Sequence, residues 1–211
     1  MQGADYVDGR FSEPPADGLE SNLGRMPVLQ TDDGAVGQST AIAYYVAAEN
    51  GFLGSNHLEA AQILAVNEHI KEMVGEYRKL VPWGTDPADK LDIWFDQGAN
   101  DVTGPAVRAN MATRYATWWM GRIEAMLGDK GFAVGDKLSW ADVSIYFIFG
   151  ETLSDDQAAE NVQYHQKAPF GSKERTDAAL EKYPKLLASV NAVRNNANHQ
   201  KWLEIRGKQG F

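Results

Sequence analysis

Residues 26–39 read MPVLQTDDGAVGQS, two short apolar segments separated by Asp-Asp-Gly, and this stretch decides the fold of the amino-terminal part of the chain. Residues 26–30 are apolar enough for a strand, and Pro27 lies at its entry, where the missing N–H of proline is tolerated. Residues 32–34 supply a tight hairpin turn, and residues 35–38 supply the returning strand. Ser39 is expected to cap a helix over residues 40–49. The stretch therefore predicts a small α/β unit of strand, hairpin, strand and helix.

After Gly54 the apolar residues follow the pattern of helices. They recur close to a 3.6-residue period over residues 57–80 and again over residues 105–127. Further helices are predicted over residues 140–151, 177–195 and 199–205, whereas the acidic residues 86–100 predict an extension or a turn. We therefore expect two domains, an α/β domain over residues 1–54 and an all-helical, all-α domain over residues 55–211.

The composition is that of an acidic globular protein without cysteine. Of 211 residues, 44% are hydrophobic and 23% are charged, which excludes a chain that is disordered throughout. A net charge of −9 repels phosphate backbones and anionic lipid, so we expect no nucleic-acid partner. The absence of cysteine excludes disulfides, thiolate metal ligands and a cysteine nucleophile within the chain. Neither a signal peptide nor a membrane-spanning stretch is recognisable, so we expect a soluble protein without membrane insertion. The lack of cysteine fits a reducing compartment, and we expect a cytoplasmic protein.

Other side chains that could carry chemistry do not form a recognisable site. The four histidines are scattered along the chain, and none combines with acidic neighbours into a metal-ligand set, so we expect no metal. Tyr115, Trp118 and Trp119 have two interpretations, the lining of an apolar pocket or the core of a helical bundle. Because they recur along a predicted amphipathic helix, the sequence favours the core.

Residues 139–142, Ser-Trp-Ala-Asp, form the pattern of a helix capping box. The Ser139 hydroxyl can accept from the N–H of Asp142, whose carboxylate can accept from the N–H of Ser139. The charge of Asp142 also suits the positive end of a helix. We therefore interpret Ser139 and Asp142 as structural residues that start the predicted helix over residues 140–151.

Two distant segments point to one family. The first segment comprises residues 24–29, 33–34 and 38–45, and the second comprises residues 135–143, followed by residues 183–186. Together they resemble the cytosolic glutathione transferases, nearest to the sigma-like group, over almost the whole chain. The resemblance implies a thioredoxin-like amino-terminal domain followed by an all-helical carboxy-terminal domain.

The resemblance also implies a glutathione site. The backbone of Met26, before a cis Pro27, would pair with the cysteine of glutathione like an added strand. The Ser39 hydroxyl and N–H would hold the γ-glutamyl carboxylate at the start of a helix, a position that favours anions. Gln38 would bond the same arm, and Arg25 would add a polar contact. The alternatives are a Pro27 that merely begins an edge strand, a Ser39 that only caps its helix, and a solvated Arg25.

The chain departs from the family pattern at the catalytic hydroxyl. In the family, a tyrosine or serine at the end of a first strand lowers the thiol pKa of glutathione. Tyr6 precedes Pro27 by only 21 residues, too few for a complete strand–helix–strand unit of about 30 or more. Tyr6 therefore matches the second strand of the family, and we assign no catalytic residue. By this comparison the thioredoxin-like domain is incomplete, because it lacks the first strand and helix of the family, and that strand is central in the family's sheet.

Three explanations of this departure are open. The chain can be truncated at its amino terminus, it can have lost a segment and taken a structural role, or residues 4–11 can have moved into the vacant strand position. The sequence favours truncation.

The expected function is that of a glutathione transferase in detoxification. It would bind glutathione as a substrate and conjugate it to small apolar electrophiles, with activity impaired by the missing hydroxyl. The alternative is a non-catalytic binding or scaffold subunit of a larger assembly. By resemblance we expect a homodimer.

Overall fold

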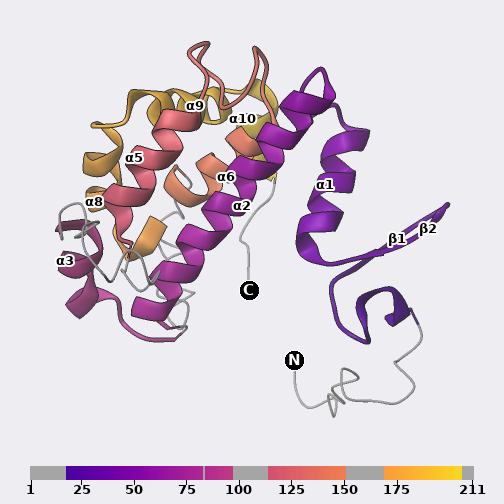
Figure 1. The fold of residues 1–211 in the computed structure, drawn as a ribbon, viewed down its shortest axis with the longest axis horizontal. Coiled ribbons are helices and arrows are strands. Elements are labelled where there is room, and N and C mark those ends of the chain that lie inside the picture. Colours follow the sequence, from indigo (N-terminus) through magenta and orange to yellow (C-terminus); the bar gives the residue numbers. More distant parts are fainter. Residues whose placement is uncertain (1–17, 83, 97–113, 151–168, 206–211) are drawn as a thin grey trace. The chain divides into compact units, whose positions relative to one another are not determined.

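A computed structural model of the 211-residue chain describes residues 18–82, 84–96, 114–150 and 169–205. It divides into two compact units, Met1–Phe52 and Leu53–Phe211 (Figure 1).

The first unit contains the predicted hairpin and the helix that follows it. A short 3₁₀ helix, η2 (Glu20–Asn22), precedes strand β1 (Val28–Thr31), which pairs antiparallel with β2 (Gly34–Gly37). The register places Thr31 opposite Gly34 at the turn and Val28 opposite Gly37 at the open end. Helix α1 (Ser39–Glu49) follows β2 directly (Figure 1). The hairpin thus places the entry of β1 beside the start of α1.

The start of α1 differs from the prediction by one residue. Gln38, not Ser39, is the N-cap residue, and its carbonyl accepts from the Ile42 N–H at 3.0 Å. The expectation that Ser39 caps the helix is therefore wrong. Because β2 ends at Gly37, Gln38 occupies the junction and Ser39 becomes the first helical residue.

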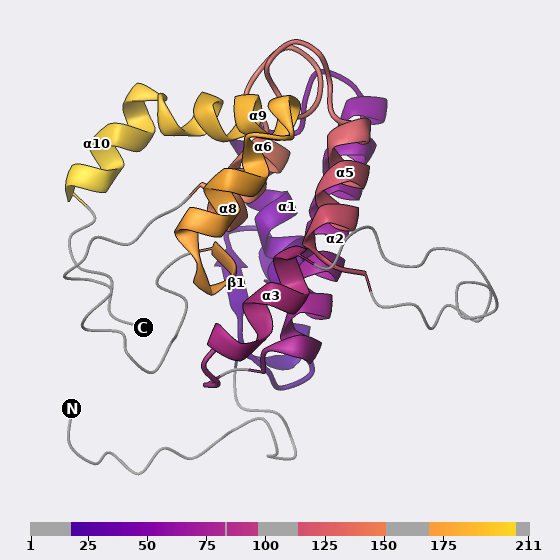
Figure 2. The same cartoon turned by 90° about the vertical axis from the view of Figure 1, so that its left-hand side faces the viewer.

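The second unit is helical in its described residues. Its longest helix, α2 (His57–Leu80), has the predicted bounds and begins at Asn56, whose side chain accepts from the Glu59 N–H. The others are α3 (Ala88–Asp96), α5 (Ala116–Met126), α6 (Trp140–Phe149), η3 (Pro169–Gly171), α8 (Lys173–Leu180), α9 (Pro184–Arg194) and α10 (Ala197–Ile205). Figure 2 shows α10 continuing outward from the end of α9, and none of its residues is buried.

Two helical predictions need correction. The prediction of a single helix over residues 177–195 is wrong, because α8 ends at Leu180 and α9 begins at Pro184. Proline has no N–H with which to continue a preceding helix, but it is well suited to the first turn of a new one. The stretch predicted as an extension or a turn forms α3, whose Trp94 and Phe95 are buried in the core. Residues 105–113 of another predicted helix lie outside the described residues.

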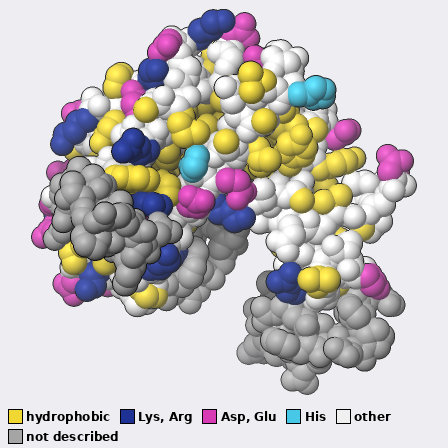
Figure 3. Space-filling view, viewed as in Figure 1, with side chains coloured by type: hydrophobic (Ala, Val, Ile, Leu, Met, Phe, Trp, Pro, Cys, Tyr) yellow, Lys and Arg dark blue, Asp and Glu magenta, His cyan; other side chains and the backbone are white. Residues whose placement is uncertain are grey.

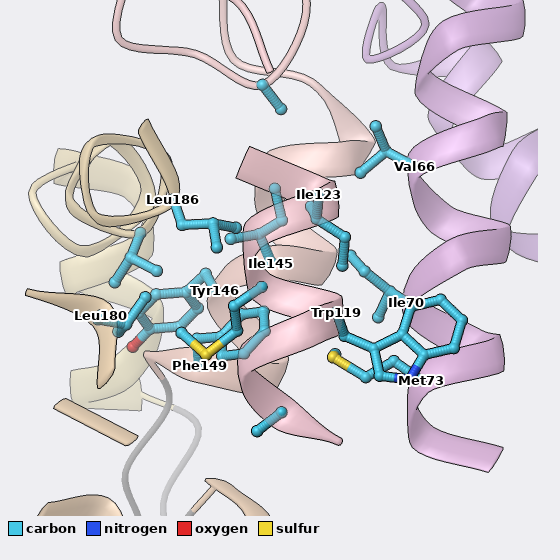
Figure 4. Close-up of a cluster of buried hydrophobic side chains, with 14 of the residues drawn as sticks. Val66, Ile70, Met73, Trp119, Ile123, Ile145, Tyr146, Phe149, Leu180 and Leu186 are labelled. Carbon is cyan, nitrogen blue, oxygen red and sulfur yellow. The ribbon is translucent and has the colours of Figure 1, made fainter. Parts of the chain in front are cut away.

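The core of the second unit forms around α6. Figure 4 shows Ile145 and Phe149 of α6 between Ile70 of α2 on one side and Leu180 and Leu186 on the other. These five side chains are almost fully buried. Burial on this scale stabilises a domain by about 1.5–3 kcal/mol for each large apolar side chain.

Among the three aromatic residues that had two interpretations, Trp119 is a core residue. It is only 3% exposed and lies near Met73 in the same cluster. Trp118 and Tyr115 are partly buried and pack against the core.

A capping box starts α6. The Ser139 N–H and hydroxyl donate to one carboxylate oxygen of Asp142, at 2.9 and 2.8 Å. The Ala133 N–H and the Ser189 hydroxyl donate to the other oxygen, each at 2.7 Å. Asp142 is fully buried. Its carboxylate therefore ties the start of α6 to the preceding loop and to α9.

The described surface of the second unit carries charges of both signs. Figure 3 shows basic and acidic side chains interspersed on the visible face. Within the four described ranges, no helix is long and apolar enough to cross a membrane.

Candidate functional site

The open end of the hairpin brings the predicted ligand residues together. Because Val28 pairs with Gly37, the residues just outside this pair, Pro27 and Gln38, lie at the same end of the two strands. The Met26–Pro27 peptide bond is cis, as the resemblance implies. Two segments separated by the hairpin therefore meet where α1 begins.

Ser39 is the first residue of α1, at the end of the helix toward which the N–H groups point and where the helix dipole is positive. Both Ser39 and Gln38 are exposed. The first turn contains no acidic residue, so no protein carboxylate there offsets the positive end of the helix. A ligand carboxylate can reach the Ser39 hydroxyl and the N–H groups together.

The backbone at Gln38 has an unusual conformation. Its φ is 69° and its ψ is 122°, in the region of positive φ that side chains other than glycine rarely adopt. Such conformations cost about 1–3 kcal/mol and cluster at ligand sites. The backbone of Gln38, at the junction between β2 and α1, therefore has a conformation that is intrinsically unfavourable for glutamine.

Arg25 and Met26 form the other side of this end of the hairpin. Met26 is 76% exposed, so the peptide before Pro27 lies at the surface of the unit. The Arg25 Nε donates to the Asn22 carbonyl at 3.4 Å, and the residue is exposed. Arg25 thus brings a positive charge to the segment that precedes Pro27.

Sequence reasoning missed one polar residue beneath this site. Asn22 is only 4% exposed, and its Nδ2 donates to the Pro27 carbonyl at 3.0 Å. Nothing in the local sequence indicates that this asparagine is buried. The signal that could have found it is Gly37, since a glycine inside a strand often marks a close approach of another segment.

These groups are suited to binding rather than to a complete reaction. The exposed donors and the helix end can hold a peptide carboxylate, and the edge before β1 can pair with a peptide backbone. Tyr6, the tyrosine considered for catalysis, lies outside the described residues. The described residues contain no group of three His, Cys, Asp or Glu placed to hold a metal ion.

A family model and two curated proteins show which known proteins this chain resembles. A family model described as the C-terminal domain of glutathione S-transferase matches residues 99–206. The chain is 32% identical to probable glutathione S-transferase 6 of Caenorhabditis elegans, a match that covers 99% of this chain and 88% of that protein. It is also 27% identical to the hematopoietic prostaglandin D synthase of Gallus gallus, and this match covers 99% of this chain and 82% of that protein.

The fold has relatives among solved structures. The crystal structure of a monomeric glutathione S-transferase from the hookworm Necator americanus matches with a TM-score of 0.55 and 23% identity, covering 91% of this chain and 79% of that chain. At this identity the match shows a shared fold.

Proposed function

Because the chain belongs to the cytosolic glutathione transferase family, we propose that its first unit binds glutathione where β1 enters and α1 begins. The observation that carries this proposal is the hairpin register, which puts the exposed Met26 peptide and the Gln38–Ser39 junction at one end of two paired strands.

Each proposed contact has a physical reason. The Ser39 hydroxyl and N–H would donate to the γ-glutamyl carboxylate, in line with the positive end of α1. The Met26 backbone would pair with the cysteine residue of glutathione as an added strand. Gln38 and Arg25 would supply further polar contacts to the tripeptide.

We propose that conjugation to small apolar electrophiles is weak. A transferase needs a group that stabilises the thiolate of glutathione, and we assign that role to none of the described residues. Loss of positioned acid–base help typically lowers a rate about 10²–10⁴-fold. The alternative is a non-catalytic binding or scaffold subunit of a larger assembly, which would show no turnover at all.

We also propose that the protein forms a homodimer in the cytoplasm. Dimers are typical of the family. In α1 the large side chains of Tyr44 and Val46 are 39% and 46% exposed, so this helix has apolar surface that a second subunit would cover. Sedimentation equilibrium should give twice the mass of the 23.2 kDa chain. A monomer mass at all concentrations would reject this proposal.

Retention on immobilised glutathione tests the binding proposal. With glutathione attached through its sulfur, the γ-glutamyl arm is free, and we expect the protein to be retained and then eluted by free glutathione. Cysteinylglycine, which lacks the γ-glutamyl arm, should not elute it. A folded protein that passes through the column would overturn the proposal, and a scaffold without a glutathione site would give that result.

A further inference from the structure

Asn22 is an unusual residue in the first unit. Within the described part of this unit, two side chains are buried: Asn22 is 4% exposed and Ala47 is 6% exposed. Asparagine is mostly found on protein surfaces, and a buried amide is costly unless it is hydrogen bonded. Its burial therefore calls for a reason.

Its hydrogen bonds connect it to the residues on one side of the proposed glutathione site. The side-chain Nδ2 donates to the Pro27 carbonyl at 3.0 Å. The Asn22 carbonyl accepts from the Arg25 backbone N–H at 3.0 Å and from the Arg25 Nε at 3.4 Å. One residue thus fixes the backbone on both sides of Met26.

Its packing connects it to the other side of the site. A Cβ added to Gly37 would lie 2.5 Å from the Asn22 Cβ and 2.6 Å from the Ser21 carbonyl oxygen. Contacts this short do not occur, so Asn22 fills the space that Gly37 leaves open. Gly37 is the residue directly before Gln38 and Ser39.

We propose that Asn22 is a positioning residue that sets the distance between the Met26–Pro27 segment and the Gln38–Ser39 junction. The inference rests on the proposed glutathione site, and Asn22 itself need not touch the ligand. An amide is needed because it donates to the Pro27 carbonyl. An aspartate of the same shape would instead place a carboxylate against that carbonyl oxygen.

The test uses two variants of the site and a matched control. Asn22→Asp removes the donor at constant size, and Gly37→Ala displaces Asn22 without removing it. The control is Asn67→Asp, because Asn67 is also buried and its Nδ2 also donates to a backbone carbonyl, that of Ile63 at 2.8 Å, but it lies in α2 of the second unit.

The first readout is amide hydrogen exchange without ligand. We expect both site variants to raise exchange at least ten-fold in residues 25–30 and 36–42, with the carboxy-terminal half of α1 unchanged. The control should leave exchange in both segments as in the wild type. Wild-type exchange in both site variants, or an equal rise throughout α1, would overturn the positioning role.

The second readout is the glutathione dissociation constant by calorimetry. We expect it to rise at least ten-fold in Asn22→Asp and Gly37→Ala and to stay unchanged in Asn67→Asp. Unchanged affinity in both site variants would overturn the inference. A wild-type protein that binds no glutathione would overturn the proposed function instead, and hydrogen exchange would still decide the role of Asn22.

Discussion

At the scale of single residues, the proposed contact between the Ser39 hydroxyl and the ligand carboxylate is the one that we expect to contribute most to glutathione binding. Ser39→Ala keeps the N–H at the start of α1 but removes the hydroxyl. Hydrogen bonds to charged groups contribute about 1.5–3 kcal/mol. We therefore expect the glutathione dissociation constant, measured by calorimetry, to rise about ten-fold or more.

Ser172 offers a matched control for this substitution. Its hydroxyl accepts from the Arg175 N–H at 3.3 Å at the start of α8, in the second unit. Ser172→Ala should lower the free energy of unfolding by about 1 kcal/mol and leave glutathione affinity unchanged. Equal affinity in Ser39→Ala and the wild type would contradict the proposed contact.

Tyr77 makes stability depend on pH in the alkaline range. Burial raises the pKa of Tyr77 from 10 to about 12, partly offset by the positive charge of Arg78. Between these values the unfolded chain loses the phenolic proton while the folded chain keeps it. The free energy of unfolding should therefore fall as pH rises from 10 to 12, by on the order of 2 kcal/mol from this group.

Urea unfolding of the wild type and Tyr77→Phe at pH 9, 10, 11 and 12 measures this contribution. The variant should show the shallower decline, because phenylalanine has no proton to lose. Parallel declines in the two proteins would show that Tyr77 does not contribute.

At the scale of elements, the start of α9 depends on a carboxylate from α5. The two oxygens of Glu124 accept from the Lys185 and Leu186 N–H groups at 3.0 and 2.8 Å. Nearby, the Tyr183 hydroxyl donates to the Thr117 carbonyl at 3.1 Å. Glu124 thus caps a helix far from it in sequence and joins two elements of the bundle.

Replacing Glu124 by alanine should destabilise the protein. We expect a loss of about 1–2 kcal/mol in the free energy of unfolding by urea, the range found for helix caps. Glu72→Ala is the control, since the Glu72 side chain is 62% exposed and its loss should change stability by less than about 0.5 kcal/mol. Equal stabilities of the two variants would reject the capping role.

Local patterns predicted the elements that are specified by local chemistry. The turn at residues 32–34 and the periodicity of α2 identified the hairpin and the longest helix. The break before Pro184 and the helix at Trp94 were missed. The interruption before Pro184 was missed because the helical period of apolar residues continues across it. The helix around Trp94 was missed because its many acidic residues suggested an exposed segment, although Trp94 and Phe95 are buried.

The candidate site could be predicted only in part. Pro27, Gln38 and Ser39 follow from the resemblance, whereas the positive φ of Gln38 and the burial of Asn22 depend on how β1, β2 and η2 pack together. No sequence pattern of a few residues encodes the packing of these three elements.

At the scale of the whole molecule, the account predicts binding with little catalysis. In a turnover assay with glutathione and a generic aryl halide, we expect a rate about 10²–10⁴-fold lower than that of an active family member assayed in parallel. Any residual rate that depends on the site should fall further in Ser39→Ala. Saturable turnover equal to that of the active relative would show that a group stabilising the glutathione thiolate is in place.

The most direct test of the central claim is an amide chemical-shift titration of the ¹⁵N-labelled protein with glutathione. The account predicts saturable shifts at Met26, Gln38, Ser39 and Thr40, around the open end of the hairpin and the first turn of α1. A folded protein whose amides in this region stay unmoved at saturating glutathione, or move only in residues 53–211, would contradict it.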